Sequence, residues 1–517
     1  MLLLLPDAEK QLNKFKTIQH KKAGLITCLF LCSGICWGQE KNWLASEDLN
    51  KPYTLILNLQ LKEARKKLLR RVGVTHDESK KAVSPEHMYV ASLADALELM
   101  ITEDDAKFDL YEDSYEKRID QLEEINPVSA GSLFALAEIR LQWTFVYLKF
   151  GHEFDAAWNI RQAYLTVQEC KKKFPDFVPI KKTSGLLEIM LGSVPEKYQW
   201  VMNLFSMEGS IDSGLQDLKQ VIEQSSTLAF ETTLLYHLFE GFVLQQTESS
   251  MQGFNQAINS FPENRLALFL GASMAIKNSQ SEKALIYLQQ VTADKNALTI
   301  PYADYQLGEV YLHKGDYESS IRSYLNFIVG YRGQNFIKDA HYKIGVCYWL
   351  MGSKTEASRY FDKAKDEGKE SAEADKYAAR QISKNTYPNI KLSKLRYATD
   401  GGYYEDAKKI ISSVNDHDLV SAEDKIEFIY RKARLFHKIG SIADAQKNYL
   451  ETIEKQGEEN WYFAPNACLQ LGYLFLGQGQ PDEAKKYFEK ALTYKKHEYK
   501  NSIDSKAKSA LAQMKKK

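Results

Sequence analysis

The stretch LGEVYLHKGDYESSIRSYLNFI, from Leu307 to Ile328, and the stretch LGYLFLGQGQPDEAKKYFEKAL, from Leu471 to Leu492, share one pattern. Each has Leu-Gly, an aromatic residue three positions later and a second Gly four positions beyond that. A small residue and an aromatic residue then follow, four positions apart. The pattern predicts two amphipathic helices joined by a tight turn at glycine. Such hairpins bury their apolar faces only by stacking, so the sequence predicts an all-α repeat protein.

Further copies keep the same register. One is IGVCYWLMGSKTEASRYFDKA (Ile344 to Ala364), and another is KARLFHKIGSIADAQKNYL (Lys432 to Leu450). A weaker copy is GGYYEDAKKII (Gly401 to Ile411), and diluted hairpins lie around Gly151 and Gly271. These residues resemble the tetratricopeptide repeat, whose pattern includes W-x2-L-G-x2-Y and A-x3-F. The resemblance implies a right-handed α-solenoid of helical hairpins.

The small and aromatic residues of the motif are expected to serve packing rather than chemistry. A small residue in the first helix lets that helix approach the second, which carries a small residue of its own. Aromatic side chains fill the remaining gap. The residues expected in this packing role are Gly308, Tyr311, Gly345, Tyr348, Ala357, Ala433, Ala445, Gly472 and Ala484.

One stretch is less generic, namely SGLLEIMLGSVPEKYQWVMNLFSMEGSIDSGLQDLKQVI, from Ser184 to Ile222. A proline follows an apolar helix, and a Gly and then a Gly-Leu pair come after it. The segment resembles the eukaryotic tetratricopeptide repeat protein 39 group and its fungal lipid-droplet-clearance relatives. The resemblance implies no catalytic residue.

The first residues of the chain have the pattern of a secretory signal. Four lysines between Lys14 and Lys22 precede the uncharged run AGLITCLFLCSGICWG (Ala23 to Gly38). This run has 16 residues, whereas a membrane-spanning helix needs about 20. Small residues before Gln39 favour cleavage there, and an uncleaved anchor is the alternative. We therefore expect an exported protein of the bacterial periplasm or cell envelope.

The pattern divides the chain into three parts. Residues 1–38 are the expected signal peptide, residues 39–262 a degenerate helical-repeat half and residues 263–517 a regular tetratricopeptide-like half. The regular half ends in a basic helix or tail, because Lys485 to Lys517 holds 11 Lys and three acidic residues. This tail is interpreted as a solvated capping helix, and contact with an anionic surface is the alternative. Membrane contact is expected only through the signal or this tail.

Composition and motif searches argue against several functions. The formal net charge is zero, which disfavours nucleic acid as a partner because such binding usually requires a basic face. The phosphate-binding, dinucleotide-binding, hydrolase and zinc-protease motifs are missing from the sequence. We therefore expect no enzyme activity and no cofactor.

Metal and disulfide chemistry are likewise not expected. Only Cys170, Cys347 and Cys468 lie beyond the signal, and their positions suit buried apolar filler rather than a disulfide framework. The run from Asn415 to Asp418 has acidic residues beside a histidine, which could bind a cation. A polar loop is the better interpretation, so we predict no metal site.

The first helices of the repeats should share one exposed face. Residues six and three before the motif's small residue, and one and four after it, lie on one side of a helix. In tetratricopeptide arrays the corresponding face lines the concave groove, and its tyrosines would suit an extended peptide or simply pack on the next repeat. The predicted groove residues are Tyr302, Tyr305, Glu309, Leu312, Asp339, Tyr342, Val346, Trp349, Glu427, Tyr430, Arg434, His437, Asn466, Leu469, Tyr473 and Leu476.

Two functions remain compatible with the sequence. One is an exported non-enzymatic scaffold that binds a protein or peptide in its groove, as in bacterial envelope assembly. The other is a helical array that handles carbohydrate, as a glycan-binding protein or an α/α-toroid glycosidase. A glycosidase needs two carboxylates roughly 5 to 10 Å apart, which the short turns do not single out. We favour the scaffold; the partner and the oligomeric state stay open.

Overall fold

The structure is a computed structural model that describes residues 43–515 except 73–82, 194–206, 295–296 and 385. In this part of the chain there are 24 α-helices and one 3₁₀ helix, and no strand. The predicted all-α, tetratricopeptide-like fold is therefore confirmed. The predicted signal peptide, residues 1–38, lies outside the described residues.

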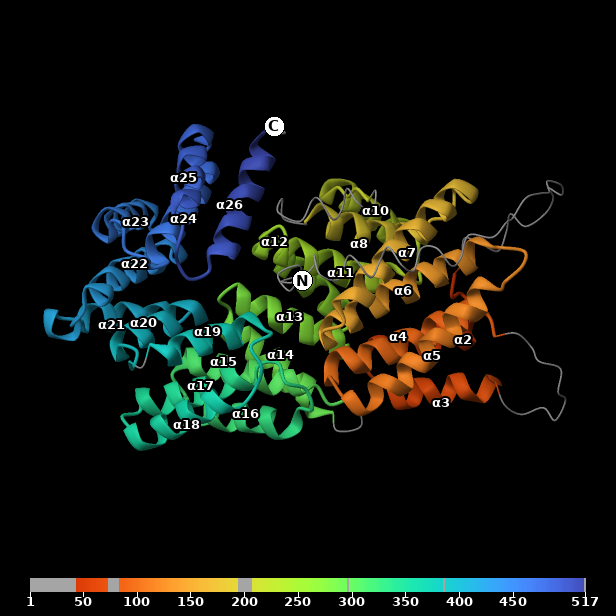
Figure 1. The fold of residues 1–517 in the computed structure, drawn as a ribbon, viewed down its shortest axis with the longest axis horizontal. Helices are drawn as coiled ribbons and strands as arrows, with labels where there is room; N and C mark the ends of the chain where they lie inside the picture. The colour runs from red at the N-terminus through yellow and green to blue at the C-terminus, as the bar shows by residue number, and fades with distance from the viewer. Residues whose placement is uncertain (1–42, 73–82, 194–206, 295–296, 385, 516–517) are drawn as a thin grey trace. The chain divides into compact units, whose positions relative to one another are not determined.

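Most helices pair with the next helix along the chain, as Figure 1 shows for α6 with α7 and for α24 with α25. The helices up to residue 277 are α2 (Glu47–Leu57), α3 (Leu61–Val72), α4 (Pro85–Thr102), α5 (Asp105–Glu123), α6 (Ala130–Phe150), α7 (Glu153–Lys173), α8 (Ile180–Gly192), α10 (Ile211–Gln224), α11 (Ala229–Phe242), α12 (Thr247–Ser260) and α13 (Arg265–Lys277). The later helices are α14 (Ser281–Ala293), α15 (Pro301–Lys314), α16 (Tyr317–Gly330), α17 (Ile337–Leu350), α18 (Lys354–Asp366), α19 (Glu373–Ser383), α20 (Ile390–Gly401), α21 (Tyr404–Ser413), η4 (Asp416–Asp418), α22 (Ala422–Lys438), α23 (Ile442–Gln456), α24 (Phe463–Gly477), α25 (Pro481–Thr493) and α26 (Lys500–Lys515).

The helices form two compact units. The N-terminal unit holds the described residues up to Met274 together with Ile286–Ala303 and Gly330–Gly333. The C-terminal unit holds Ala275–Leu285, Asp304–Val329 and Gln334–Lys517. The chain therefore passes between the units more than once, within the hairpins around α13 to α16. Pro262, the last residue of the predicted degenerate half, lies inside the N-terminal unit.

The motif glycines of the C-terminal unit stand where two helices touch. A Cβ atom at Gly308 would lie 2.7 Å from the ring of Tyr324, and one at Gly472 would lie 2.5 Å from the ring of Phe488. Gly345 faces Phe361 in the same way, at 2.7 Å. The other packing residues agree: Ala357, Ala433, Ala445 and Ala484 are completely buried, while Tyr311 and Tyr348 are partly buried. Glycine is required because any side chain would push the helices apart.

The turns of these hairpins have a second glycine with a left-handed backbone. Its φ angle is +81° at Gly315, +85° at Gly352, +79° at Gly440 and +71° at Gly479. The weaker copy has the same feature at Gly402, with φ +86°. A residue with a side chain adopts this conformation only at a cost, so the second motif glycine ends the first helix of each hairpin.

The N-terminal unit contains a buried, charged lysine, Lys182. The Nζ atom of Lys182 lies 2.8 Å from a carboxylate oxygen of Glu138 and 2.8 Å from one of Glu231. The hydroxyls of Tyr53 and Tyr89 donate to the other oxygen of Glu231, at 2.6 and 3.0 Å. Burial opposes the charge of Lys182, but the two glutamates outweigh it and hold the lysine pKa above its ordinary value. The side chain is 1% exposed, so this polar centre is closed to solvent.

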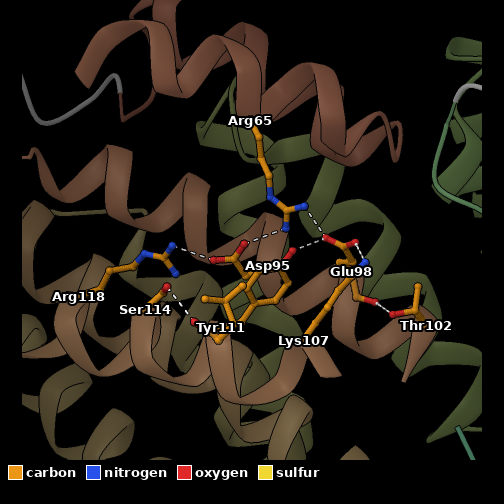
Figure 2. Close-up of polar contacts among 9 residues, drawn as sticks. Arg65, Asp95, Glu98, Thr102, Lys107, Tyr111, Ser114 and Arg118 are labelled. Atoms are coloured by element: carbon orange, nitrogen blue, oxygen red, sulfur yellow. Dashed lines mark hydrogen bonds and ion pairs between the residues drawn. The ribbon is translucent and has the colours of Figure 1, made fainter. Parts of the chain in front are cut away.

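A second polar network joins α3, α4 and α5 (Figure 2). Arg65 of α3 bridges Asp95 and Glu98, which lie one turn apart on α4. From α5, Arg118 donates to Asp95 at 2.7 Å and Lys107 donates to Glu98 at 2.6 Å. Each carboxylate thus has two cationic partners, and the network fixes how the three helices pack.

All three cysteines of the described chain, Cys170, Cys347 and Cys468, are buried and are not joined in disulfides. Burial raises the pKa of Cys347 and of Cys468 to about 12. A thiol that stays protonated is a weak nucleophile, so these residues act as small apolar filler, as the sequence predicts.

Candidate functional site

A cavity of about 410 Å³ lies in the C-terminal unit. First helices of successive hairpins provide much of its wall, namely α15, α17, α20 and α22. Residues at the C-terminal end of α13, on α19 and just before α26 complete it. The residues that carry its chemistry are Lys277, Glu309, His313, Asp339, Tyr342, Lys343, Tyr377, Arg396, Tyr397, Asp400, Arg434, Lys438 and Tyr499.

One part of the wall is a cluster in which Lys343 of α17 is paired with two carboxylates. Its Nζ atom lies 2.5 Å from Glu309 of α15 and 3.0 Å from Asp339 of α17. The hydroxyl of Tyr305 donates to Asp339 at 2.6 Å. Burial alone would raise the pKa of Glu309, but Lys343 and His313 outweigh it and lower that pKa. For Asp339 burial prevails, and its pKa is raised despite Lys343.

Another part of the wall is formed by α20 and α22. The guanidinium of Arg396 donates to the hydroxyl of Tyr377 at 2.8 Å and lies 3.7 Å from Asp400. Its carbon lies 5.3 Å from the centre of the Tyr377 ring and 5.7 Å from that of Tyr397. Burial would raise the pKa of Asp400, but the positive charges of Arg396, Arg431 and Arg434 outweigh it and lower that pKa. This part of the wall is therefore cationic.

The comparison with protein families concerns most of this chain. A family model described as Iml2/Tetratricopeptide repeat protein 39 matches residues 144–471, which is more than half of the chain. The chain belongs to this family. A model described as tetratricopeptide repeat also matches residues 465–498. Both findings confirm the resemblances predicted from the sequence.

Three solved structures illustrate the wider similarity. PilW, a type IV pilus biogenesis factor, is 17% identical, with 44% of this chain and 91% of PilW covered and a TM-score of 0.32. A Rap protein complexed with Competence and Sporulation Factor is 13% identical over 72% of this chain and 99% of Rap, with a TM-score of 0.34. A human IFIT1 dimer with m7Gppp-AAAA is 14% identical over 85% and 94%, with a TM-score of 0.30. Scores this low support no inference about partners.

The segment that resembles the Iml2/tetratricopeptide repeat protein 39 family brings two backbones together. A Cβ atom at Gly185 of α8 would lie 2.7 Å from the carbonyl oxygen of Gly214 on α10, and one at Gly214 would lie 2.5 Å from that of Gly185. Gly214, the glycine of the Gly-Leu pair, therefore serves the packing of α8 against α10. This agrees with the expectation that the segment has no catalytic residue. Residues 194–206 of the segment lie outside the described residues.

The structure brings some predicted groove residues together at the cavity and places others elsewhere. Glu309, Leu312, Asp339, Tyr342 and Arg434 line it. The remaining aromatic side chains pack inside the protein: Tyr305 and Tyr430 are 2% exposed, Trp349 stacks on Tyr387, Tyr473 packs edge-on against Phe488, and Tyr302 is partly buried against Phe269. The remaining polar side chains have neighbours of their own: Glu427 pairs with Arg431, Asn466 accepts a hydrogen bond from Gln470, and His437 lies against Tyr449. Val346 and Leu469 are buried, and Leu476 is 38% exposed.

The predicted tyrosine stripe is largely a packing layer. Tyr305 meets the rings of Tyr324 and Phe327, at 5.5 and 5.4 Å between ring centres. Tyr342 and Tyr430 are 5% and 2% exposed. A ligand in the cavity would therefore meet charged groups more than tyrosine faces. That the groove residues bind a partner remains a prediction.

Several residues of the cavity wall were not predicted, although the spacing of the repeats indicates them. In each regular repeat the small residue of the first helix lies seven positions before the left-handed glycine of the turn. Counting seven positions back from Gly402 of the weaker copy gives Leu395 as the equivalent position. The next residue, Arg396, is then the equivalent of Glu309 and Arg434. Extending the weak copy backwards by one helix would have found it.

A second missed group shares one helix position. His313, Asp400 and Lys438 all stand five residues after the equivalents of the small residue, one position beyond those predicted. The structure places all three on the cavity wall. One more residue is about 100° around a helix, so the face that lines the cavity is broader than the predicted stripe.

Two general findings complete the description. No helix in the described part of the chain is both long and apolar enough to cross a membrane. The same residues contain no group of three or more His, Cys, Asp or Glu arranged to hold a metal ion. The acidic stretch at η4 is held locally, since Asp418 pairs with Lys391 at 2.7 Å.

Proposed function

We propose that this chain is a non-catalytic scaffold that binds a protein or peptide partner in the cavity of its C-terminal unit. The observation that carries the proposal is the cavity itself, because successive hairpins contribute their first helices to one wall. An extended segment placed there would contact several repeats at once, as repeat proteins commonly do. Membership of a tetratricopeptide-type family supports this kind of role.

The carboxylates of the cavity favour binding over hydrolysis. Glu309 and Asp339 share one cation, Lys343, at 2.5 and 3.0 Å. Asp400 lies beside Arg396, and its pKa is lowered. A glycosidase needs one carboxyl that is protonated near neutral pH and stands free to donate to the leaving group. Asp339 is the acid whose pKa is raised, but its side chain is 1% exposed and held by Lys343 and Tyr305, so it does not stand free for that chemistry.

We also propose that the protein acts outside the cytoplasm, in the bacterial periplasm or cell envelope. The support is the lysine-flanked apolar run before Gln39. The full chain should be expressed in a bacterial host, fractionated, and its N-terminus sequenced. A mature chain that starts at Gln39 in the periplasmic fraction is expected. An unprocessed chain in the cytoplasm would overturn this part of the proposal.

The binding proposal is tested by filling the cavity. Ala374 of α19 lines it, so Ala374→Trp places an indole ring inside. Ala443→Trp is the matched control, because Ala443 is an exposed residue of α23 in the same unit. Cross-linking with mass spectrometry in envelope extract should map partner peptides to the cavity wall in the native chain and the control. Equal capture by Ala374→Trp, or cross-links elsewhere, would contradict the proposal.

A further inference from the structure

The cavity wall gathers more cations than acids at one place. Lys277, Arg434 and Lys438 line it, and Lys506 of α26 stands near enough to Lys277 for its charge to lower the pKa of that lysine. We call these four residues the cation cluster. They come from three separate parts of the chain, the end of α13, α22 and α26. Stacking repeats does not require four cations to meet in this way.

The acids nearby are already committed. Asp400 is the carboxylate that acts on Arg434 and Lys438, and it also serves Arg396 and Arg431. Glu309 and Asp339 are bound to Lys343, and Glu373, the fourth acid on the cavity wall, pairs with Lys376. Within the described chain, Lys438 and Lys506 take part in none of the ion pairs. Lys438 and Lys506 therefore give the cation cluster positive charge that is not taken up by an ion pair in the described chain.

This positive charge has an effect on the lysines themselves. Burial, and then the charge of Lys506, lowers the pKa of Lys277 to about 8. Burial and Arg434 also lower the pKa of Lys438 and of Lys506. Like charges held together in a partly dry cavity disfavour protonation. A bound anion would reverse this effect, so the free site is poised for a negative ligand.

We propose that the cation cluster is an anion-binding subsite that receives acidic side chains of the partner segment. The inference rests on the proposed binding function and adds the chemistry of the ligand. The cavity volume of about 410 Å³ exceeds what one small anion needs and suits a few residues of extended chain. The carboxylates at the Lys343 cluster would repel a long polyanion. An acidic peptide, whose charges can be confined to one end, fits both parts of the wall.

The test uses the full chain and a defined probe. The probe is a fluorescein-labelled, acetylated and amidated tetraglutamate peptide, and its tetraglutamine analogue is the neutral control. Anisotropy at low salt should show saturable binding of tetraglutamate only. Lys438→Met and Lys506→Met should each weaken binding by about tenfold, as for loss of one close charge pair. Lys409→Met, which changes a 77% exposed lysine of α21, should leave binding unchanged.

Further measurements keep the outcomes distinct. Lys438→Arg should restore binding, and the melting temperatures should show that the methionine variants fold. Equal binding by native chain and variants would overturn the inference, as would binding of inorganic phosphate without tetraglutamate, which indicates a small-anion site. If Ala374→Trp abolishes partner capture but Lys438→Met and Lys506→Met leave it unchanged, the anion-binding subsite is contradicted and the proposed binding function stands. Capture unaffected by Ala374→Trp would sink the proposed function.

Discussion

The two units of this protein handle charge in opposite ways. In the N-terminal unit, Lys182 is enclosed by Glu138 and Glu231, and each of these three charges has a partner. In the C-terminal unit, charged residues surround a cavity, and the cation cluster exceeds the acids that face it. A closed centre in which every charge already has a partner serves the fold. An open, unbalanced one leaves interaction energy available to a ligand.

The largest expected effect comes from removing the lysine of the closed centre. Lys182→Met leaves Glu138 and Glu231 buried without their cation, which should destabilise the N-terminal unit by about 3–5 kcal/mol. Chemical denaturation followed by circular dichroism measures the loss. Lys173→Met is the control, because Lys173 is 50% exposed and pairs with Glu169 on the surface; it should change stability by less than about 0.5 kcal/mol.

The same centre allows a stricter test. Adding Glu138→Gln and Glu231→Gln to Lys182→Met removes the orphaned charges, so part of the lost stability should return. A triple variant that is less stable than Lys182→Met alone would show that the shape of the side chains, rather than the pairing of their charges, dominates this centre.

A smaller effect is expected at the Lys343 cluster of the cavity wall. Lys343→Met removes the cation shared by Glu309 and Asp339 and should cost about 2 kcal/mol. The cost is lower than for Lys182 because Lys343 is 13% exposed and Glu309 is 24% exposed, so water from the cavity can reach that acid. The two variants should be compared under the same denaturant conditions. A larger loss for Lys343→Met than for Lys182→Met would contradict the contrast between the units.

Helix packing in the C-terminal unit predicts an effect of similar or smaller size. Gly472→Ala places a Cβ atom 2.5 Å from the ring of Phe488, so the hairpin must shift, at a cost of about 1–3 kcal/mol. Gly477→Ala is the matched control on the same helix, because nothing lies within 4 Å of its added Cβ. Thermal melts of both variants check the prediction. Equal melting temperatures would mean that the α24–α25 contact is soft.

The smallest effect concerns pH and the cation cluster. The pKa of Lys277 is lowered to about 8 in the folded chain, whereas an unfolded chain has the ordinary value of about 10.4. The unfolded state therefore binds more protons between these values, and stability should rise with pH there. Lys506 acts on Lys277 directly, and the charged groups Arg434, Lys438, Asp400 and His313 line the same cavity.

Denaturation at pH 7.5 and pH 9 measures this effect as a difference. The stability of the native chain relative to Lys277→Met should be greater at pH 9, because only the native chain loses the unfavourable charge. Subtracting the variant removes the contribution of the many buried tyrosines. A difference that stays constant or falls with pH would show that Lys277 is well compensated.

The regular repeats were predictable because their packing requirement is local. Gly308 and Gly472 must be small for a reason that lies within one hairpin, so their spacing is legible in the sequence. The polar centres were not predictable in this way. Glu138, Lys182 and Glu231 come from three hairpins and look like ordinary charged helix residues until the chain is folded.

The cavity lies between these cases. Glu309 and Arg434 followed from the repeat register, and Arg396 would have followed from Gly402 had the weak copy been extended by one helix. Lys506 could not have been found, because it follows the last recognisable repeat and no motif places it near Lys277. Periodicity predicts what neighbours share, and it does not predict which distant helix closes the site.

The hydrogen bond from Tyr53 to Glu231 joins residues 178 positions apart, and that from Thr227 to Trp43 joins residues 184 positions apart. At ribosomal speeds of about 5–20 residues per second, α2 would emerge roughly 10–35 seconds before its partner helix exists. The bond from Tyr305 to Asp339 spans only 34 positions. During synthesis the first unit must therefore wait for its last helices with apolar surface uncovered, whereas the hairpins of the second unit, such as α15 to α17, can pair soon after they are made.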